Sequence, residues 1–435
     1  MSTSPTRSGW ERFWKWLLVP ANVFLSVLIV VAGLRVCWPN AAAEKLQEFV
    51  GQEIVVSGKL YDDPDFDGSL AKVRIRVDDG NQLFVTFRAN KAPLARGDTV
   101  VVRGKLKEGF GAFSGSIHRG ELVSYSKSNP PDKFLQVRDW FSNLVERHIP
   151  EPESALALGY LLGQKRALPS ALLNVLAITG LTHIVVASGA NLTIITRMFR
   201  RLFRKSRLRV LIVALLAVGF MVGVIGFAPS LVRASLVSIL ALVAWYFGRP
   251  VHPVRLILLA AATTLIVSPT FILDLGWQLS FAAFGGVLLV APVLTRFFYG
   301  DVKPKTLPQI AIETLSATIT TLPILLYSFG YVSLISLVPN LLILPTIPLA
   351  MLLSFLTGVF AIFANWLAGL AGVLATFVLK YHLAVINIFG EMDFAIAKVS
   401  LSARQTMVAY GVILVLWLAM KFGTKTRLLD VNIVE

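Results

Sequence analysis

Long runs without a charged residue constrain this chain more than any other feature. Several long stretches contain no Asp, Glu, Lys or Arg, and the longest extends over 66 residues, from Thr314 to Leu379. A helix that crosses a membrane needs about 20 apolar residues, so that stretch alone has room for about three. Charged residues make up 15% of the 435 residues, against about 25% in soluble proteins. The chain is therefore a multi-span α-helical membrane protein and not a disordered, fibrous or ordinary soluble one.

Prolines interrupt the longest apolar run. Pro323, Pro339, Pro345 and Pro348 divide it, which predicts broken or re-entrant helices. Such helices are tolerated only where they are buried or line a cavity. Counting these segments with the other runs gives about ten spans, and residues 151–423 form the transmembrane core.

The first 43 residues predict a membrane span that leads out of the cytoplasm. Trp16 to Leu34 is free of charge and follows an aromatic belt at Trp10 and Trp14. Asn40 to Ala43 also resembles a signal-peptidase site, but the apolar run exceeds the usual 7–15 residues. Of the two interpretations, we favour a retained signal anchor.

Residues 44–128 have a different character, with frequent charges and alternating apolar positions. The pattern predicts five strands, at residues Glu53–Tyr61, Leu70–Val77, Gln82–Arg88, Asp98–Leu106 and Ser116–Tyr125. Five short strands within about 80 residues suit a small OB-like β-barrel. A basic amphipathic stretch at 129–150 then predicts a helix lying on the membrane surface.

Positive charge predicts the orientation of the core. The net charge is +16, and basic residues gather at 197–209, at 296–305 and at 421–427. Cytoplasmic loops carry excess Lys and Arg, so these groups and both termini, including the tail at 424–435, are expected in the cytoplasm. The OB-like domain then lies outside the cell membrane.

Metal and covalent chemistry have little support in the sequence. Cys37 is the single cysteine, and the five histidines form neither an HxH nor an HExxH pattern. No nucleophile–base pair stands out either. We therefore expect no metal, no cofactor and no enzymatic activity.

Polar residues and helix breakers coincide between Ala155 and Arg201. Membrane-buried polar groups usually face the bundle interior or a water-filled path, although a helix–helix hydrogen bond that serves packing alone is the alternative. Arg233 and Asp274 flank apolar runs, and their residue types would allow an ion pair. The candidate path residues from this pattern are Lys165, Arg166, His183, Ser188, Gly189, Asn191, Arg233 and Asp274.

Five segments, in order, resemble the ComEC-type competence proteins. They read LLGQKRALP, GLTHIVVASGANLTII, FAPSLVRASL, LDLGWQLSFAAFGGVLL and SLVPNLLILPTIPL. The resemblance adds Gln278 and Asn340 as candidate path residues and implies an extracellular OB-like domain before the core. Two positions depart from the family pattern: Asn191 replaces a common His and Gln164 a common Asp. Asn and Gln keep hydrogen bonding but lose titration and charge, so we expect no proton transfer at these two positions.

The resemblance also implies partners. Many relatives carry a metallo-β-lactamase-like nuclease domain, whose HxHxDH motif this sequence lacks. A separate nuclease, an external DNA receptor and a cytoplasmic helicase-like motor are expected by resemblance only.

The predicted strands place basic groups and one aromatic on outward-facing positions. Single-strand binding uses basic groups along the backbone and rings that stack on bases. The alternative is that these residues form an ordinary solvent-exposed face of the sheet without a binding role. The candidate DNA-binding residues are Arg74, Arg76, Phe84, Arg88, Arg103 and Lys105.

These patterns together predict an inner-membrane channel that passes single-stranded DNA into the cytoplasm during natural transformation. A secondary transporter for a small anionic solute is the alternative, because broken helices and buried polar groups fit it too. A membrane-bound hydrolase is disfavoured.

Overall fold

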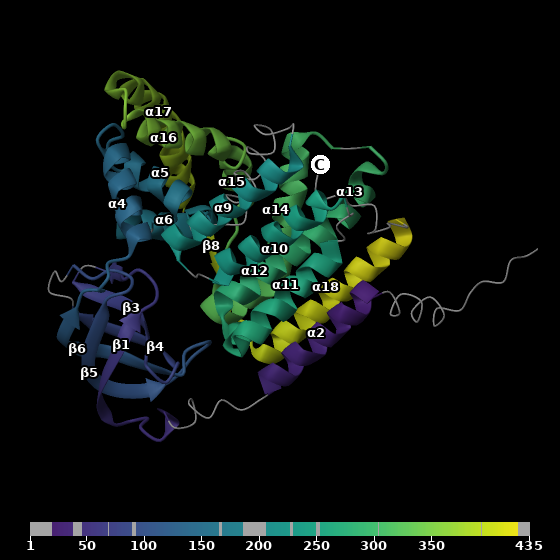
Figure 1. Ribbon diagram of the computed structural model, residues 1–435. Helices are drawn as coiled ribbons and strands as arrows, with labels where there is room; N and C mark the ends of the chain where they lie inside the picture. Colours follow the sequence, from purple (N-terminus) through teal and green to yellow (C-terminus); the bar gives the residue numbers. More distant parts are fainter. Residues whose placement is uncertain are drawn as a thin grey trace, which may run out of the picture.

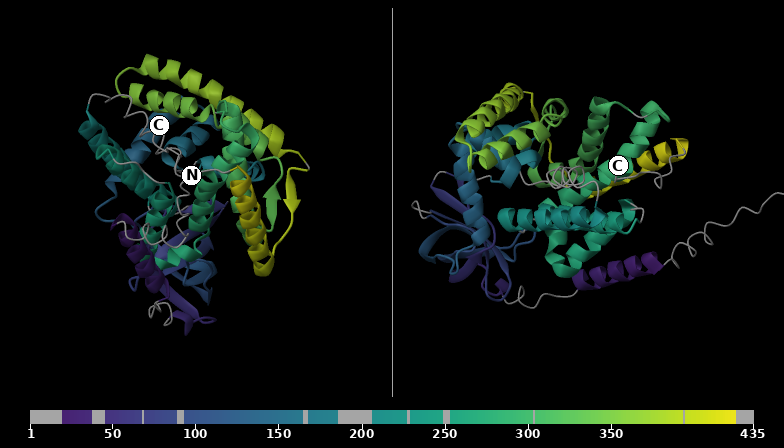
Figure 2. Two further views of the ribbon diagram at one scale, coloured as in Figure 1. Left: turned by 90° about the vertical axis from the view of Figure 1, so that its right-hand side faces the viewer. Right: turned by 45° about the horizontal axis from the view of Figure 1, so that its top comes forward.

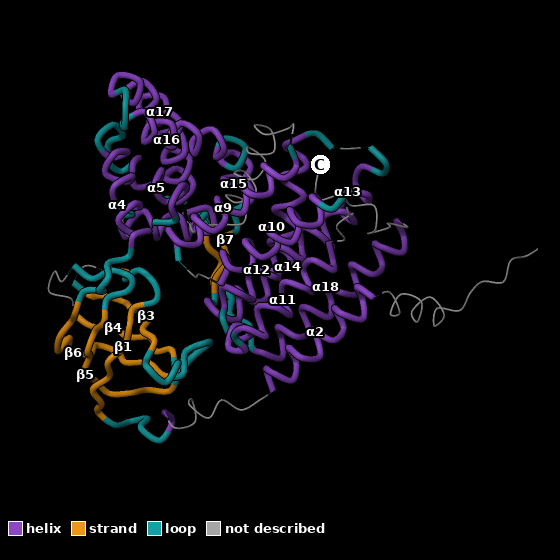
Figure 3. Tube along the Cα trace, viewed as in Figure 1, coloured by secondary structure: helices purple, strands orange, loops and turns teal. Residues whose placement is uncertain are grey.

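A strand-rich domain and a helical body make up the computed structural model (Figure 1). The structure describes residues 20–37, 46–67, 69–88, 93–164, 168–185, 206–226, 229–248, 253–302, 304–392 and 394–424. Figure 3 shows the strands of the domain gathered apart from the helices, and a short second sheet lying within the helical body.

Six strands form the sheet domain, in the order β1-β5-β6-β4-β3-β2. Apolar side chains alternate inward and form a core of their own, which includes Val73, Ile75, Leu83, Val85 and Phe87. The five predicted strands are confirmed to within two residues at each end, and a short β2 lies between the first two. The strands are β1 Glu53–Leu60, β2 Asp65–Asp67, β3 Leu70–Arg76, β4 Gln82–Arg88, β5 Thr99–Glu108 and β6 Gly115–Ser126.

The strand pairings of this domain return to their starting strand. β1 pairs antiparallel with β5 along its length, and its end also pairs with β3 through Lys59 with Arg76 and Leu60 with Ile75. β4 and β6 pair in parallel, with Val85 opposite Ile117. The pairings β1–β5–β6–β4–β3–β1 thus form a ring.

The helical body contains five helices that are long and apolar enough to cross a membrane, or six if one bent pair counts as a span. This confirms the membrane class for the described residues, whereas the count of about ten spans stays a prediction. The helices are α2 Pro20–Cys37, α4 Lys133–Glu146, α5 Glu153–Leu162, α6 Ser170–Ile178, α7 Thr182–Val185, α9 Arg207–Ile225, α10 Pro229–Tyr246, α11 Pro253–Val267, η2 Pro269–Leu273, α12 Leu275–Gly285, η3 Gly286–Val290, α13 Ala291–Tyr299, α14 Thr306–Phe329, α15 Leu337–Ile343, α16 Ile347–Phe360, α17 Asn365–Gly390 and α18 Ala403–Thr424.

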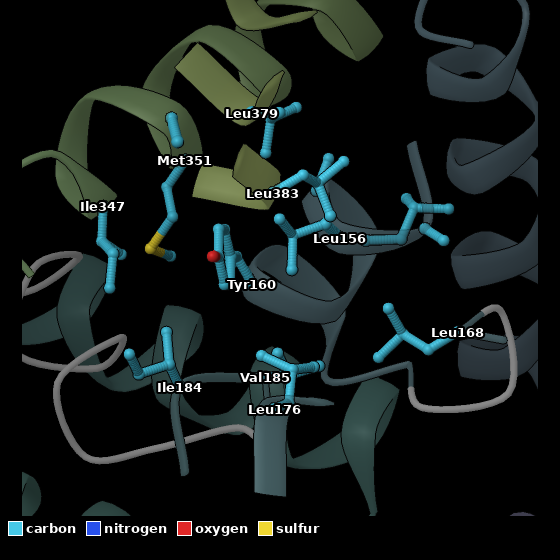
Figure 4. Packing of buried hydrophobic residues seen from close by; sticks show 14 of the residues in the cluster. Leu156, Tyr160, Leu168, Leu176, Ile184, Val185, Ile347, Met351, Leu379 and Leu383 are labelled. Atoms are coloured by element: carbon cyan, nitrogen blue, oxygen red, sulfur yellow. The ribbon is translucent and has the colours of Figure 1, made fainter. Parts of the chain in front are cut away.

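The helices gather in two groups (Figure 2). One group joins α9–α14 with α2 and α18, and the other joins α4–α7 with α15–α17. The strands β7 Tyr331–Ser333 and β8 Ile396–Lys398 pair with each other. Along the chain β7 connects α14 to α15, and β8 connects α17 to α18, so both strands lie where the chain passes from one group to the other. In the second group, side chains from α5, α7, α16 and α17 surround the buried Tyr160 (Figure 4).

The expected proline break is found at one place. α15 and α16 meet at an angle of 48° across residues 344–346, where Pro345 and Pro348 prevent a continuous helix. Pro323, by contrast, lies inside α14 without ending it. The long helix from Leu275 to Tyr299 contains a π-helical turn, η3.

Two arginines join the sheet domain to the helical body. Arg138 of α4 is 4% exposed and forms an ion pair with Asp63 of the sheet domain. In the other direction, Arg96 of the sheet domain pairs with Asp132 at 3.0 Å and donates to the Gly223 carbonyl near the end of α9. Asp132 also caps α4, because its carboxylate accepts the Phe134 and Leu135 N–H groups. These contacts fix the orientation of the domain.

The amphipathic stretch at 129–150 contains α4. Leu135, Ser142 and Val145 are buried on the face that packs against α9 and α16. Val137 and Trp140 are about half exposed on the other face. An apolar outer face with a tryptophan is what a membrane-surface helix presents.

We expect Arg138→Gln to loosen the sheet domain. Removing one partner of a buried ion pair costs about 3–5 kcal/mol, whereas the exposed pair of Arg74 with Asp62 is worth at most about 1 kcal/mol. Thermal unfolding and protease cleavage between residues 127 and 132 measure the effect in purified protein. Arg74→Gln is the matched control, and equal effects of the two variants would contradict the docking role.

Candidate functional site

An aromatic cluster lies on the outer surface of the sheet domain. The Phe84 ring of β4 lies 5.4 Å from Phe110, 5.7 Å from Phe113 and 6.2 Å from His118. Phe110 is 49% exposed. Phe84 was predicted from the sequence, but its three ring partners were missed, although Phe110 lies between two glycines in the Gly109–Phe113 loop. An exposed ring held by others is a rigid surface on which a flat group can stack.

Arginines border the aromatic cluster. Arg74 lies directly across from Phe84 in the pairing of β3 with β4, and it forms an exposed ion pair with Asp62 at 2.9 Å. Arg76 lies over the Tyr61 ring at 5.4 Å. Arg88, at the end of β4, lines an open hollow together with Arg119 and Glu121. The β3–β4 surface therefore combines positive charge with exposed rings.

Arg103 and Lys105 lie on a different side of the domain. Both are exposed on β5, between β1 and β6, where Lys105 faces Glu53 and Arg103 faces Val55 and Glu121. The ring order separates β5 from β4 by β6 and from β3 by β1. The six candidate DNA-binding residues thus occupy two surfaces rather than one.

The β3–β4 surface adjoins the helical body. The pKa of the Tyr61 phenol is raised to about 12, mainly by burial; the Arg74 charge opposes this rise, and the Asp62 and Asp274 carboxylates contribute to it. Asp274, at the start of α12, therefore acts electrostatically across the boundary. Gly111 of the aromatic loop also approaches the Leu273 carbonyl so closely that a Cβ would lie 3.1 Å from it. The aromatic loop and the start of α12 form one neighbourhood.

Several candidate path residues cannot be placed. Lys165, Arg166, Ser188, Gly189 and Asn191 lie outside the described residues. Gln164 is described, and its side-chain amide donates to the Ser142 hydroxyl of α4 at 2.9 Å.

Arg233 is a buried charge without a carboxylate partner among the described residues. Its Nε donates to the Ser280 hydroxyl at 2.6 Å, and its guanidinium lies 5.1 Å from the Phe284 ring and 5.8 Å from Phe281. The residue types allowed an ion pair with Asp274, but within the described part of the chain Arg233 forms these contacts instead. Ring faces stabilise a cation only in part, so the guanidinium keeps capacity for an anion.

Asp274 and Gln278 organise the turn that begins α12. The Asp274 carboxylate accepts the Trp277 N–H at 2.8 Å and caps the helix. The Gln278 amide donates to the Ile272 carbonyl at 2.8 Å. Both side chains have a local structural role at the boundary with the sheet domain.

His183 and Asn340 belong to a second neighbourhood. The His183 ring bonds the Gly180 carbonyl at 3.0 Å, and the Asn340 amide donates to the Ser336 carbonyl at 2.8 Å. Gly180 packs directly against Ser336: a Cβ on Gly180 would lie 2.6 Å from the Ser336 Cβ. Asn340 is 3% exposed, and its amide oxygen has no hydrogen-bond partner in the described structure. This buried acceptor sits next to the break between α15 and α16.

A buried polar chain connects α5, α17 and that helix break. The Tyr160 hydroxyl lies 3.3 Å from Nδ1 of His382, and the Thr346 hydroxyl lies 2.7 Å from Nε2. Thr346 also donates to the Ile343 carbonyl, so its oxygen accepts a hydrogen bond from the Nε2–H group of His382, and the tyrosine hydroxyl donates to Nδ1. Sequence reasoning missed these residues, because single polar residues in apolar helices carry no spacing signal.

Within the described ranges, no group of three His, Cys, Asp or Glu residues could hold a metal ion. The arrangement instead offers a cationic aromatic surface outside the body and isolated polar neighbourhoods within it. These features define a polytopic helical membrane protein with an attached sheet domain that presents binding groups at the body's edge.

Residues 160–423 match the competence protein family, and the chain belongs to that family. The resemblance to ComEC-type competence proteins is therefore confirmed, and the family supports a role of the chain in competence. A relative is the "ComE operon protein 3" of Bacillus subtilis (strain 168), 27% identical over 245 residues. The match covers 55% of this chain and 31% of that relative, so the chain spans about a third of its length. No solved structure matches.

We expect His382→Phe to destabilise the second helix group. An aromatic ring is kept while both buried hydrogen bonds are removed, and each removed bond costs about 1–3 kcal/mol when a partner stays unsatisfied. Thermal unfolding in detergent measures the decrease in stability.

Tyr381→Phe is the matched control, since it removes one bond to the Leu342 carbonyl from an exposed neighbouring position. It should cost about 1 kcal/mol or less. If His382→Phe cost no more than this control, the polar chain would not hold the helices together.

Proposed function

We propose that this protein is a channel of DNA uptake that passes a single DNA strand through the inner membrane into the cytoplasm. One observation carries the proposal: the aromatic loop beside the β3–β4 arginines approaches the start of α12, with Gly111 close to the Leu273 carbonyl. A strand bound there would be delivered directly to the edge of the helical body. The competence family supports the setting.

The sheet domain is, in this proposal, an OB-like barrel. The ring of pairings with one parallel contact between β4 and β6 supports it. OB-folds bind oligonucleotides on their second and third strands and on the loops between the first two and last two strands. In chain order, with the short β2 left out, those strands are β3 and β4, and Phe110 lies in the loop between the last two strands, β5 and β6.

The proposed topology places the sheet domain outside and both termini in the cytoplasm. Arg96 holds the end of α9 against the sheet domain, so Arg207 and Arg209 lie at the opposite end of that helix. Arg207 in turn stacks over Trp245 near the end of α10. The basic residues then face the cytoplasm. About ten spans follow if the shorter apolar helices also cross.

Transport through such a path needs no covalent step, so we propose that the chain is not an enzyme. A separate nuclease, an external DNA receptor and a cytoplasmic helicase-like motor are proposed partners. Lipid packs against the exposed apolar faces, for example around Phe377 and Val415.

A secondary transporter for a small anionic solute is the second candidate. The break between α15 and α16 beside the unsatisfied Asn340 amide favours it, because such transporters bind solutes at broken helices near the midplane. The width of the path separates the two functions, since a nucleotide chain needs a continuous polar route.

Deletion of the gene tests the channel. Fluorescent DNA should reach the cell surface of the deletion strain but not its cytoplasm, and expression of the protein should restore entry. Normal cytoplasmic arrival of DNA without the protein would overturn the proposal. Loss of a small anion's uptake with normal DNA entry would favour the transporter.

The sheet domain, residues 44–128, should bind single-stranded DNA weakly and in a salt-dependent manner. Replacing Arg74, Arg76 and Arg88 by Gln should lower the salt slope by up to about 2, at ~0.7 for each phosphate that the protein no longer neutralises. Phe110→Ala should cost about 1–3 kcal/mol if a base stacks there. Fluorescence anisotropy over a salt series measures both.

The paired variant Arg103→Gln with Lys105→Gln is the control for charge alone, because both residues lie on the other surface. A slope change as large as that of the β3–β4 variant would contradict a defined binding surface. Absence of DNA binding by the sheet domain at low salt would contradict the proposed binding surface altogether.

A further inference from the structure

Lys380 is a charged residue in the middle of a candidate span. It lies 15 residues after the start of α17 and 10 before its end, and this helix passes the length and hydropathy test for crossing a membrane. At 1.5 Å per residue the Lys380 backbone is about 4 Å from the midpoint of the helix. The hydrocarbon layer extends about 15 Å to either side of its centre.

The structure leaves this charge without a partner. The Lys380 side chain is exposed, and no hydrogen bond or ion pair joins it to any described residue. Charges within membrane spans almost always pair or face a water-filled cavity. A lysine that faced lipid at this depth would have to reach the interface, about 11 Å away, which exceeds the length of its four methylene groups.

The exposed side of α17 divides into two stripes. At 100° per residue, five polar or small residues lie within about 40° of Lys380, namely Gly369, Thr376, Ala384, Asn387 and Glu391. Val373 and Trp366 are the large apolar residues within the same angle, and Trp366 lies at its edge next to the apolar stripe. The neighbouring stripe is apolar and exposed throughout its length, with Leu370, Leu374, Phe377 and Ile388. One side of α17 suits lipid, and the other suits water.

The rotation of α17 is fixed next to Lys380. The Tyr381 hydroxyl donates to the Leu342 carbonyl of α15 at 3.2 Å. His382 is fully buried between Tyr160 and Thr346. Since the two residues that follow Lys380 are held by other helices, Lys380 cannot turn into the bundle core.

We propose that the Lys380 stripe of α17 lines a water-filled path through the helical body and that the Lys380 ammonium contacts phosphates of the DNA strand in transit. The contact with phosphate rests on the proposed function; the access of water does not. A lysine suits this role, because a compact charge on a flexible stem holds phosphate without the rigid bidentate geometry of arginine. Asn387 and Glu391 extend the same polar surface by about 17 Å toward the end of the helix.

The single cysteine makes water access directly testable. In a Cys37→Ser background, we place one cysteine at Lys380 or Asn387 on the polar stripe, or at Leu374 or Ile388 on the apolar stripe. A positively charged methanethiosulfonate reagent is added to membranes open on both sides. The polar-stripe cysteines should react at least about tenfold faster, since the reagent attacks a thiolate that forms only in contact with water.

Equal, slow reaction of the four cysteines in folded protein would overturn the water-filled path. If the Lys380→Cys variant does not fold, Asn387→Cys tests the same stripe at a second position. Thermal unfolding of each variant checks that it is folded. This result does not depend on the nature of the transported molecule.

The phosphate contact has a separate test. Imported DNA per folded molecule should fall severalfold for Lys380→Gln and stay close to the parent for Lys380→Arg, with Leu374→Gln as a control for polarity on the other stripe. Unchanged import by Lys380→Gln would overturn the phosphate contact, even if the cysteine at 380 reacts with the reagent. DNA entry into cells without the protein would instead contradict the channel function, whereas the conclusion from cysteine labelling would remain valid.

Discussion

Two arginines that cross the boundary in opposite directions set the geometry on which the rest depends. Arg138 reaches from α4 to Asp63, and Arg96 reaches from the sheet domain to Asp132 and the Gly223 carbonyl. Because one contact lies at the start of α4 and another at the end of α9, the domain is held at more than one point. The aromatic loop is thereby kept beside Leu273, which fixes the end of the helical body that adjoins the candidate binding surface.

Within the body, every polar side chain in the apolar helices must be satisfied or face water, because an unpaired group in hydrocarbon is costly. The described polar groups differ in how far they are satisfied. His382 is satisfied in a chain from Tyr160 to Thr346 and the Ile343 carbonyl. Arg233, the Asn340 amide oxygen and Lys380 are only partly satisfied or free among the described residues, so they keep capacity for an incoming ligand or water.

Sequence patterns predicted the parts of the fold that repeat. Alternation located the strands of the sheet domain to within two residues, and the prolines at 345 and 348 located the break between α15 and α16. Non-local contacts had no such pattern. The Arg233–Asp274 pair was chemically reasonable, but Ser280 and two rings surround Arg233, since proximity between helices depends on packing that residue types do not encode.

The same limit explains how the candidate site changed. Period-two spacing placed Arg103 and Lys105 outward like Arg74 and Arg76. In a ring of paired strands, however, outward-facing residues of different strands can lie on different surfaces of the domain. Which outward residues share a surface is decided by strand order, which spacing does not reveal. Lys380 was overlooked because it ended the longest charge-free run and so resembled a boundary. Only the length of α17, which continues 10 residues beyond it, shows that this charge belongs to the interior of the span, where a lysine needs either a partner or water.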